Sequence, residues 1–163
     1  MKKIIFTRHA KSSWDYEVSD IDRPLKMRGI QDAYLIGDRL KKENYHPNLV
    51  FSSPANRAMH TALIMLRQMA ISPSTLKIDA NLYDFEGSSL ITTIKSLPNE
   101  ADTAMLFGHN YAMTSVVNML GDKFIDNVTT AGVVVINFAS SNWENIPEEK
   151  GVTELVLFPK QLK

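Results

Sequence analysis

Three short apolar runs, far apart along this chain, each lead into a histidine or an arginine. The three junctions are residues 4–9, which end in Arg8 and His9, residues 49–57, which end in Arg57, and residues 105–109, which end in His109. If the apolar runs are buried parallel strands, their carboxyl ends lie at one edge of a sheet, where open α/β sheets bind ligands. One junction could arise by chance, but three of one kind predict a shared site.

The residue types at these junctions suit a phosphate group. A guanidinium presents a planar fork of donors that matches phosphate oxygens in pairs, which lysine does less well. Positive charge beside an imidazole lowers its pKa, so we expect His9 to be neutral at physiological pH and therefore nucleophilic. Ser53 before Pro54 is typical of an N-cap with proline at the first helical position. This start would place Arg57 one turn into a helix whose free N–H groups face the strand ends.

The sequence between the junctions alternates between helical and strand periodicity. Apolar residues recur at helical spacing over residues 30–40, 59–69, 90–97 and 113–120, and β-rich stretches cover residues 103–107, 133–138 and 152–158. Ser88 or Ser89 could cap the third helix. This alternation predicts one α/β domain over residues 1–163 with a largely parallel sheet. The polar residues 140–150 are expected to form a hairpin-like or long loop connection at the sheet edge, and the order of the strands stays open.

Composition and charge limit the classes of function. The chain has 163 residues, enough for one domain with a proper core, and its 18 Lys+Arg balance 18 Asp+Glu. This balance argues against nucleic acid or a membrane surface as partner. The chain has no cysteine, which excludes disulfides and thiolate catalysis. The apolar stretch after Met1-Lys2-Lys3 is too short for a signal peptide, and no apolar run approaches the length of a membrane span, so we expect a cytoplasmic protein.

Several motifs, in order along most of the chain, resemble the histidine phosphatase superfamily, and most closely its phosphohistidine phosphatases of the SixA type. The motifs are Thr7-Arg8-His9-Ala10-Lys11-Ser12-Ser13-Trp14, Asp22-Arg23-Pro24-Leu25 leading to Arg28-Gly29, residues 53–62, Leu82-Tyr83, Gly108-His109-Asn110 and Thr130-Ala131-Gly132. The resemblance implies a phosphoglycerate-mutase-like fold, a three-layer α/β/α sandwich with a mostly parallel central sheet. It also implies a phosphatase that needs no cofactor.

The resemblance assigns roles to the residues at the junctions. His9 would attack phosphorus and carry the phosphoryl group as a covalent intermediate, which water then discharges. Arg8 and Arg57 would clamp the phosphate, and His109 would be a second imidazole that is protonated beside the bound phosphate and donates hydrogen bonds to it. A further donor is expected from Ser53 or Asn110. A metal site at His9 and His109 is disfavoured, because no third ligand stands out and the arginines would repel a cation.

The general acid is the least defined part of this site. Larger members of the superfamily use a glutamate after the strand that precedes the middle helix, but residues 82–88 hold Asp84 and Glu86 outside a recognisable acid motif. An imidazole leaving group departs readily because the P–N bond is labile, so a missing acid favours a phosphohistidine-bearing protein as substrate. The alternatives are a small-molecule phosphomonoesterase with Asp84 or Glu86 as the acid, and a phosphate-binding regulatory module with little turnover.

Other polar residues receive a structural interpretation first. We expect His46 in a surface loop and His60 in helix packing, although His60 could face the pocket. Residues 11–14 form either an ordinary loop or a pocket rim, in which Lys11 attracts anions and Trp14 packs beside the substrate. Residues 20–24 are typical of a helix start and a solvated charge cluster, for which we expect no catalytic role.

Overall fold

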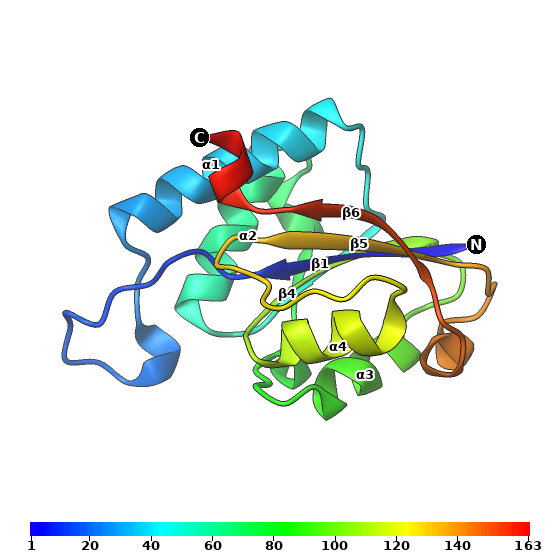
Figure 1. The fold of residues 1–163 in the computed structure, drawn as a ribbon. Helices are drawn as coiled ribbons and strands as arrows, with labels where there is room; N and C mark the ends of the chain where they lie inside the picture. The colour runs from blue at the N-terminus through cyan, green and yellow to red at the C-terminus, as the bar shows by residue number, and fades with distance from the viewer.

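The computed structural model describes all 163 residues, which fold around one six-stranded sheet (Figure 1). The strands are β1 (Lys2–Arg8), β2 (Leu49–Ser52), β3 (Leu76–Ile78), β4 (Thr103–Gly108), β5 (Val133–Phe138) and β6 (Val152–Leu157). Their order across the sheet is β3-β2-β4-β1-β5-β6. The long central strands β1 and β4 are almost entirely buried, as expected for parallel strands covered on both faces.

The sheet is mostly parallel, as the alternation of helices and strands predicts. Strands β3, β2, β4 and β1 pair in parallel, whereas β5 is antiparallel to both β1 and β6. The stretch between β5 and β6 is thus a hairpin-like connection, as expected. It also contains a 3-10 helix, Trp143–Glu148, which its polar composition does not indicate. The short edge strand β3 has no clear signal in the sequence either, because only one of its three residues is half-buried.

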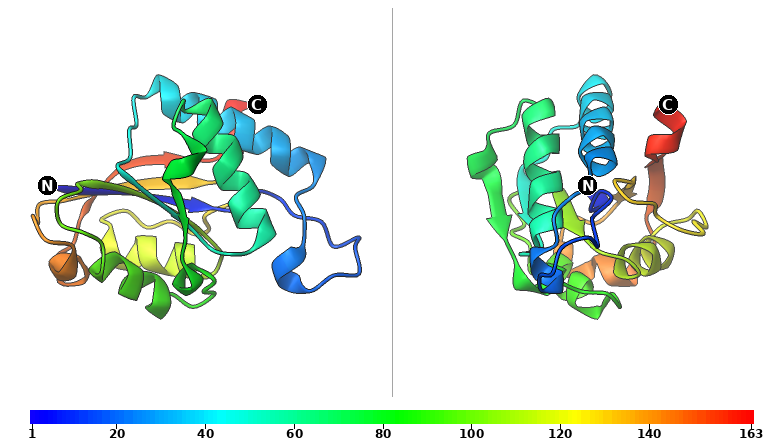
Figure 2. Two further views of the ribbon diagram at one scale, coloured as in Figure 1. Left: turned by 180° about the vertical axis from the view of Figure 1, so that it is seen from behind. Right: turned by 90° about the vertical axis from the view of Figure 1, so that its left-hand side faces the viewer.

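Helices cover both faces of the sheet (Figures 1 and 2). Helices α1 (Met27–Lys42) and α2 (Asn56–Gln68) lie on one face, and α3 (Ser88–Lys95) and α4 (Ala112–Leu120) on the other. Alternation along β1 separates the two cores: Ile5 packs with α1 and α2, while Ile4 and Phe6 pack with α3 and α4. The three-layer α/β/α sandwich is confirmed. None of the helices is both long and apolar enough to cross a membrane.

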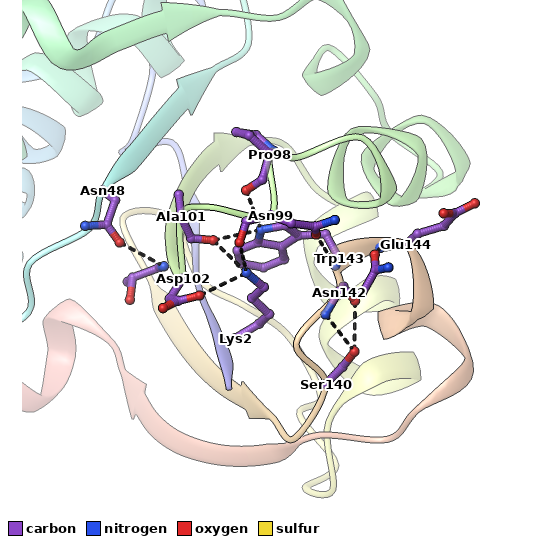
Figure 3. Close-up of polar contacts among 11 residues, drawn as sticks. Lys2, Asn48, Pro98, Asn99, Ala101, Asp102, Ser140, Asn142, Trp143 and Glu144 are labelled. Carbon is purple, nitrogen blue, oxygen red and sulfur yellow. Dashed lines mark hydrogen bonds and ion pairs between the residues drawn. The ribbon is translucent and has the colours of Figure 1, made fainter.

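A buried lysine makes several polar contacts at the end of β1 that is opposite the predicted site. The Nζ atom of Lys2 donates to the carbonyl oxygens of Asn99 and Ala101, at 2.7 and 2.9 Å, and pairs with Asp102 at 2.9 Å (Figure 3). Only 1% of Lys2 is exposed. The fully buried Trp143 also uses its indole N–H in this cluster, where it donates to the carbonyl oxygens of Pro98 and Ala101. Lys2 therefore bonds β1 to the turn before β4, and its ammonium group lies 5.1 Å from the centre of the Trp143 ring in the β5–β6 connection.

Removing the ammonium group of Lys2 should destabilise the fold more than removing that of the neighbouring Lys3. Lys2→Met keeps the apolar stem but removes the donor to Asn99 and Ala101, and we expect a loss of about 2 kcal/mol or more in the free energy of unfolding. Lys3→Met is the control. Partly exposed Lys3 pairs with Glu154 and lies 5.3 Å from the centre of the Tyr45 ring, so its replacement should change stability by less than about 1 kcal/mol. Urea unfolding followed by circular dichroism measures both. Equal effects of the two substitutions would contradict the structural role of Lys2.

Candidate active site

The backbone around His9 is held between two neighbouring strands. The His9 N–H donates to the carbonyl of Gly108 at 3.0 Å, and the His9 carbonyl accepts from Ala131 N–H at 3.0 Å. The Ser53 N–H likewise donates to the carbonyl of Phe107 at 3.0 Å. Strand pairing therefore continues past the ends of β1 and β2, against the last two residues of β4. It brings the three polar junctions of the sequence to one edge of the sheet, as expected for parallel strands.

The imidazole of His9 is buried and held through one of its two nitrogens. Its Nδ1 lies 2.7 Å from the carbonyl oxygen of Ala10, and because a carbonyl only accepts, Nδ1 carries the proton and Nε2 carries the lone pair. Burial lowers the pKa of His9 to about 3, with help from the charges of His109, Arg57 and Arg8, although the bond to Ala10 acts in the opposite direction. His9 is therefore a neutral imidazole at physiological pH, with a free nucleophilic nitrogen.

His109 lies beside His9 and keeps one nitrogen free. The centroids of the two rings are 5.1 Å apart. The Nε2 atom of His109 lies 2.8 Å from Ser53 Oγ, while its Nδ1 is buried without a hydrogen-bond partner. Ser53 Oγ also accepts from the Ala55 N–H at 3.1 Å. Where the Ser53 proton points at Nε2, His109 carries its own proton on Nδ1 and can donate it to a bound anion. Burial, and then the charge of Arg57, lower the pKa of His109 to about 3.

The two arginines of the predicted clamp are held by their terminal nitrogens. Arg8 donates from Nη1 to the carbonyl of Val128 at 3.0 Å. Arg57, of which only 2% is exposed, donates from Nη1 to the carbonyl of Asp20 at 2.6 Å and from Nη2 to its carboxylate at 2.9 Å. The Nε atoms of both arginines are buried without a partner. Each guanidinium thus has one buried N–H group, at Nε, that makes no hydrogen bond within the protein.

The expectation that Ser53 caps the following helix is wrong. Helix α2 begins two residues after Pro54, at Asn56, with Ala55 as its N-cap, because the Ser53 hydroxyl bonds to the N–H of Ala55 rather than to a helical N–H. Arg57 is therefore the second residue of the helix rather than one turn inside it. Ser53 remains in the site through its contact with His109.

Asp20 is a site residue that the sequence interpretation missed. Residues 20–22 form a short 3-10 helix in the long loop after β1, which agrees with the expected helix start, and Asp20 and Asp22 are exposed. Besides Arg57, the Asp20 carboxylate accepts from the Tyr83 hydroxyl at 2.5 Å and from Arg23 at 3.2 Å. Partial burial acts to raise the pKa of Asp20, but the bonds from Tyr83, Arg57 and Arg23 lower it to about 2. One ionised carboxylate thus joins three separate segments beside the histidines.

Arg23 is a third buried guanidinium that the sequence interpretation placed in solvent. Its Nε donates to the carbonyl of Ser13 at 3.2 Å, and its terminal nitrogens bond to Ser12 and Asp20. Its central carbon lies 3.4 Å from the centre of the Trp14 ring. The signal available in the sequence was the spacing of Asp20 and Arg23, which a single turn brings together.

A cavity of about 270 Å³ lies at these residues, and His109 and Ser53 are not part of its lining but lie behind His9. Four residues expected in the site line it, namely Arg8, His9, Arg57 and Asn110, and they are joined there by Lys11, Trp14, Asp20, Arg23 and Phe85. His60 does not line the cavity, and His46 is exposed in a loop, as expected. Residues 11–14 contribute to the rim rather than to an ordinary loop. No group of three or more histidine or carboxylate side chains is placed to hold a metal ion.

Asn110 lines the cavity and also bonds together the segments that surround it. Its amide nitrogen donates to Asn127 at 2.8 Å and to the carbonyl of Val128 at 3.3 Å, and its oxygen accepts from Thr114 in the first turn of α4. Because Val128 also accepts from Arg8, Asn110 helps to place the carbonyl that orients the clamp. Both amide protons of Asn110 face acceptors of the protein.

Neither candidate acid lines the cavity. The Asp84 carboxylate accepts from the backbone N–H groups of Glu86, Gly87 and Leu90. Burial acts to raise the pKa of Asp84, but these bonds lower it below its usual value. Asp84 therefore caps α3, whose N-cap residue is Gly87, so the expected cap at Ser88 or Ser89 is wrong. Glu86 is exposed and lies outside the cavity lining.

Comparison with known proteins agrees with this architecture. The chain is 27% identical over 164 residues to an uncharacterised protein of Mycobacterium leprae, which covers 93% of this chain and 97% of that protein. It is 26% identical over 108 residues to phosphoglycerate mutase 1 of Saccharomyces cerevisiae, which covers 61% of this chain and 44% of the mutase.

Two solved structures share the fold over most of the chain. One is the protein histidine phosphatase SixA in complex with tungstate, with a TM-score of 0.83, 20% identity and coverage of 99% of both chains. The other, from Agrobacterium tumefaciens, is provisionally assigned as the phosphohistidine phosphatase SixA. It has a TM-score of 0.75 and 26% identity, and the match covers 84% of this chain and 92% of that chain.

The sequence model of the histidine phosphatase superfamily (branch 1) matches residues 4–114. This segment spans more than half of the chain and includes all three junctions, from Arg8 and His9 through Arg57 to His109. The resemblance on which the sequence analysis relied is therefore confirmed: the chain belongs to the histidine phosphatase superfamily.

Proposed function

We propose that this protein is a phosphatase that removes phosphoryl groups from phosphohistidine on another protein, through a covalent intermediate on its own His9. Membership of the superfamily supports phosphatase activity. The observation that carries the mechanism is the set of three buried nitrogen atoms without hydrogen-bond partners, Arg8 Nε, Arg57 Nε and His109 Nδ1, around a neutral His9. Buried donors without acceptors are costly, so their presence together supports an anion as the missing partner.

In the first step, the lone pair on His9 Nε2 forms a bond to phosphorus while the bond from phosphorus to the substrate's nitrogen breaks. The electron pair of that bond leaves with the substrate imidazole, which takes a proton from solvent. Phosphoryl transfer places negative charge on the equatorial oxygens while the attacking and leaving atoms stand in line. Arg8, Arg57 and the Nδ1–H of His109 would donate to these oxygens as preorganised groups.

In the second step, water attacks the phosphorus of phosphorylated His9 on the face that the substrate imidazole has left. The P–N bond to Nε2 breaks, its electron pair returns to the imidazole, and the protons of the water are shared between the released phosphate and solvent. Nδ1 of His9 keeps its bond to the Ala10 carbonyl throughout, which holds the ring in one orientation. The enzyme then returns to its starting state.

The carboxylates around the cavity favour a substrate with a labile P–N bond. Asp84 is committed to the cap of α3, and Glu86 is outside the cavity. Asp20 lines the cavity, but its low pKa keeps it ionised, so it has no proton to donate at neutral pH. An alkoxide needs such a proton, whereas an imidazole leaves without one from the enzyme. The likeness at 26% identity to the Agrobacterium tumefaciens protein that is provisionally assigned as a phosphohistidine phosphatase supports the same substrate.

Replacing the proposed nucleophile should abolish turnover and leave the fold intact. His9→Ala removes the only nitrogen placed to attack phosphorus, so hydrolysis of a phosphohistidine peptide should fall at least about a thousandfold. The control is His60→Ala, since His60 does not line the cavity, and it should retain normal activity. Circular dichroism verifies folding. Near-normal hydrolysis by a folded His9→Ala variant would rule out the covalent mechanism.

Both the charge and the planar shape of the Arg57 guanidinium should contribute to kcat/KM. Arg57→Ala should lose about 3 kcal/mol of transition-state stabilisation, or roughly a hundredfold in kcat/KM. Arg57→Lys should lose less, because it keeps the charge but not the planar fork held by Asp20. The control is Arg67→Ala at the exposed end of α2.

We propose that catalysis by these arginines needs no metal ion, so the same assay in EDTA should show full activity. Activity lost in EDTA and restored by a divalent cation would contradict this part of the proposal. Vanadate should compete with substrate in the wild type and less well in Arg57→Ala.

A further inference from the structure

Two aromatic rings at the mouth of the cavity have no role in the mechanism above. Trp14 is 73% exposed and Phe85 is 43% exposed, and both line the same cavity as His9 and Arg57. They come from segments far apart in the sequence, the loop after β1 and the turn before α3. Aromatic side chains usually bury most of their surface, so two exposed rings beside a phosphate pocket suggest a binding surface.

Trp14 is fixed on one face and open on the other. The guanidinium of Arg23 lies 3.4 Å from the centre of the Trp14 ring. Arg23 is itself buried and bonded to Ser12, Ser13 and Asp20, so it cannot move away from the ring without breaking these bonds. With Arg23 on one face and most of the residue exposed, the other face of the indole is available to a ligand.

Phe85 is fixed beside the histidines. Its ring centroid is 4.9 Å from that of His109 and 5.2 Å from that of Tyr83, which it meets edge-on. The Phe85 carbonyl accepts from the Tyr111 N–H at 3.0 Å. The ring of His109 in turn lies 5.1 Å from the ring of His9. Only the His109 ring therefore separates Phe85 from the proposed nucleophile.

We propose that Trp14 and Phe85 form an aromatic rim that binds the flat imidazole of the substrate's phosphohistidine by stacking. This inference deepens the proposed function and rests on it. In-line attack by His9 places the leaving group on the far side of phosphorus, toward the mouth, where both rings are exposed. A planar aromatic leaving group can pack on either ring, whereas a leaving group without a ring gains little from them. The rim thus selects the substrate by the shape of its leaving group.

The test compares two substrates that both have a labile bond to phosphorus but differ in whether the leaving group has a ring. N-phosphoimidazole carries the ring, and acetyl phosphate does not. For Trp14→Ala and Phe85→Ala, we expect kcat/KM for N-phosphoimidazole to fall about fivefold or more, mainly through KM. The value for acetyl phosphate should fall less, so the ratio of the two kcat/KM values should drop in both variants.

Three variants separate stacking from a loss of structure. Trp14→Phe keeps a ring and should recover most of the activity on N-phosphoimidazole, whereas Phe85→Leu keeps apolar volume without a ring and should not. Phe124→Ala is the matched control, because Phe124 is 84% exposed and lies outside the cavity, and it should match the wild type on both substrates.

The possible results separate this inference from the proposed function. If the wild type hydrolyses both compounds and the rim variants lose activity on both equally, or on neither, the aromatic rim is wrong while the proposed function stands. If the wild type hydrolyses acetyl phosphate but not N-phosphoimidazole, the proposed substrate is wrong and the rim inference falls with it. If it hydrolyses neither compound, the protein is not the proposed phosphatase. The inference about the aromatic rim is then wrong as well.

Discussion

The site depends on the parallel alignment of three neighbouring strands, β2, β4 and β1, with hydrogen bonds that continue beyond the ends of β1 and β2. His9 is bonded on one side to the strand end at Gly108 and on the other to Ala131, and Ser53 is bonded to Phe107. Backbone groups held in this way cannot shift without breaking sheet pairing, so His9 and Ser53 are placed by the sheet. This rigidity is what a nucleophile and its charge-stabilising groups require.

Burial and charge together set the chemical state of the two histidines. Three guanidiniums, from Arg8, Arg23 and Arg57, gather at one cavity with Asp20 as the carboxylate that joins two of them. Burial is the main cause that lowers the pKa of each histidine, and the arginine charges add to it. The unfolded chain would take up protons near the usual histidine pKa of about 6.5, whereas the folded chain resists them until about pH 3. The neutral pair therefore favours the folded state at neutral pH, and this stability is lost as the pH falls from about 6.5 toward 3.

The sequence predicts the parts of the site that follow local rules. An apolar run followed by His9 or His109 indicates a buried strand end, and helical spacing locates the four main helices. The contacts of Asp20 and Arg23 depend on how a long loop folds back onto Tyr83 and α2, which no local periodicity encodes. The same reason explains the antiparallel direction of β5, since strand pairing is set by contacts distant in the sequence. The prediction that Ser53 caps α2 was wrong because the Ser53 hydroxyl is held between Ala55 and His109.

The most direct test of this mechanism is to trap the phosphorylated enzyme. Wild-type protein is mixed with a phosphohistidine peptide and quenched in base during the first turnover, and the phosphoryl group is located by mass spectrometry and ³¹P NMR. Because Nδ1 of His9 is occupied by its bond to the Ala10 carbonyl, we expect an acid-labile phosphoryl group on Nε2 of His9. A phosphoryl group on another residue, or rapid turnover without any phosphorylated enzyme, would contradict this account.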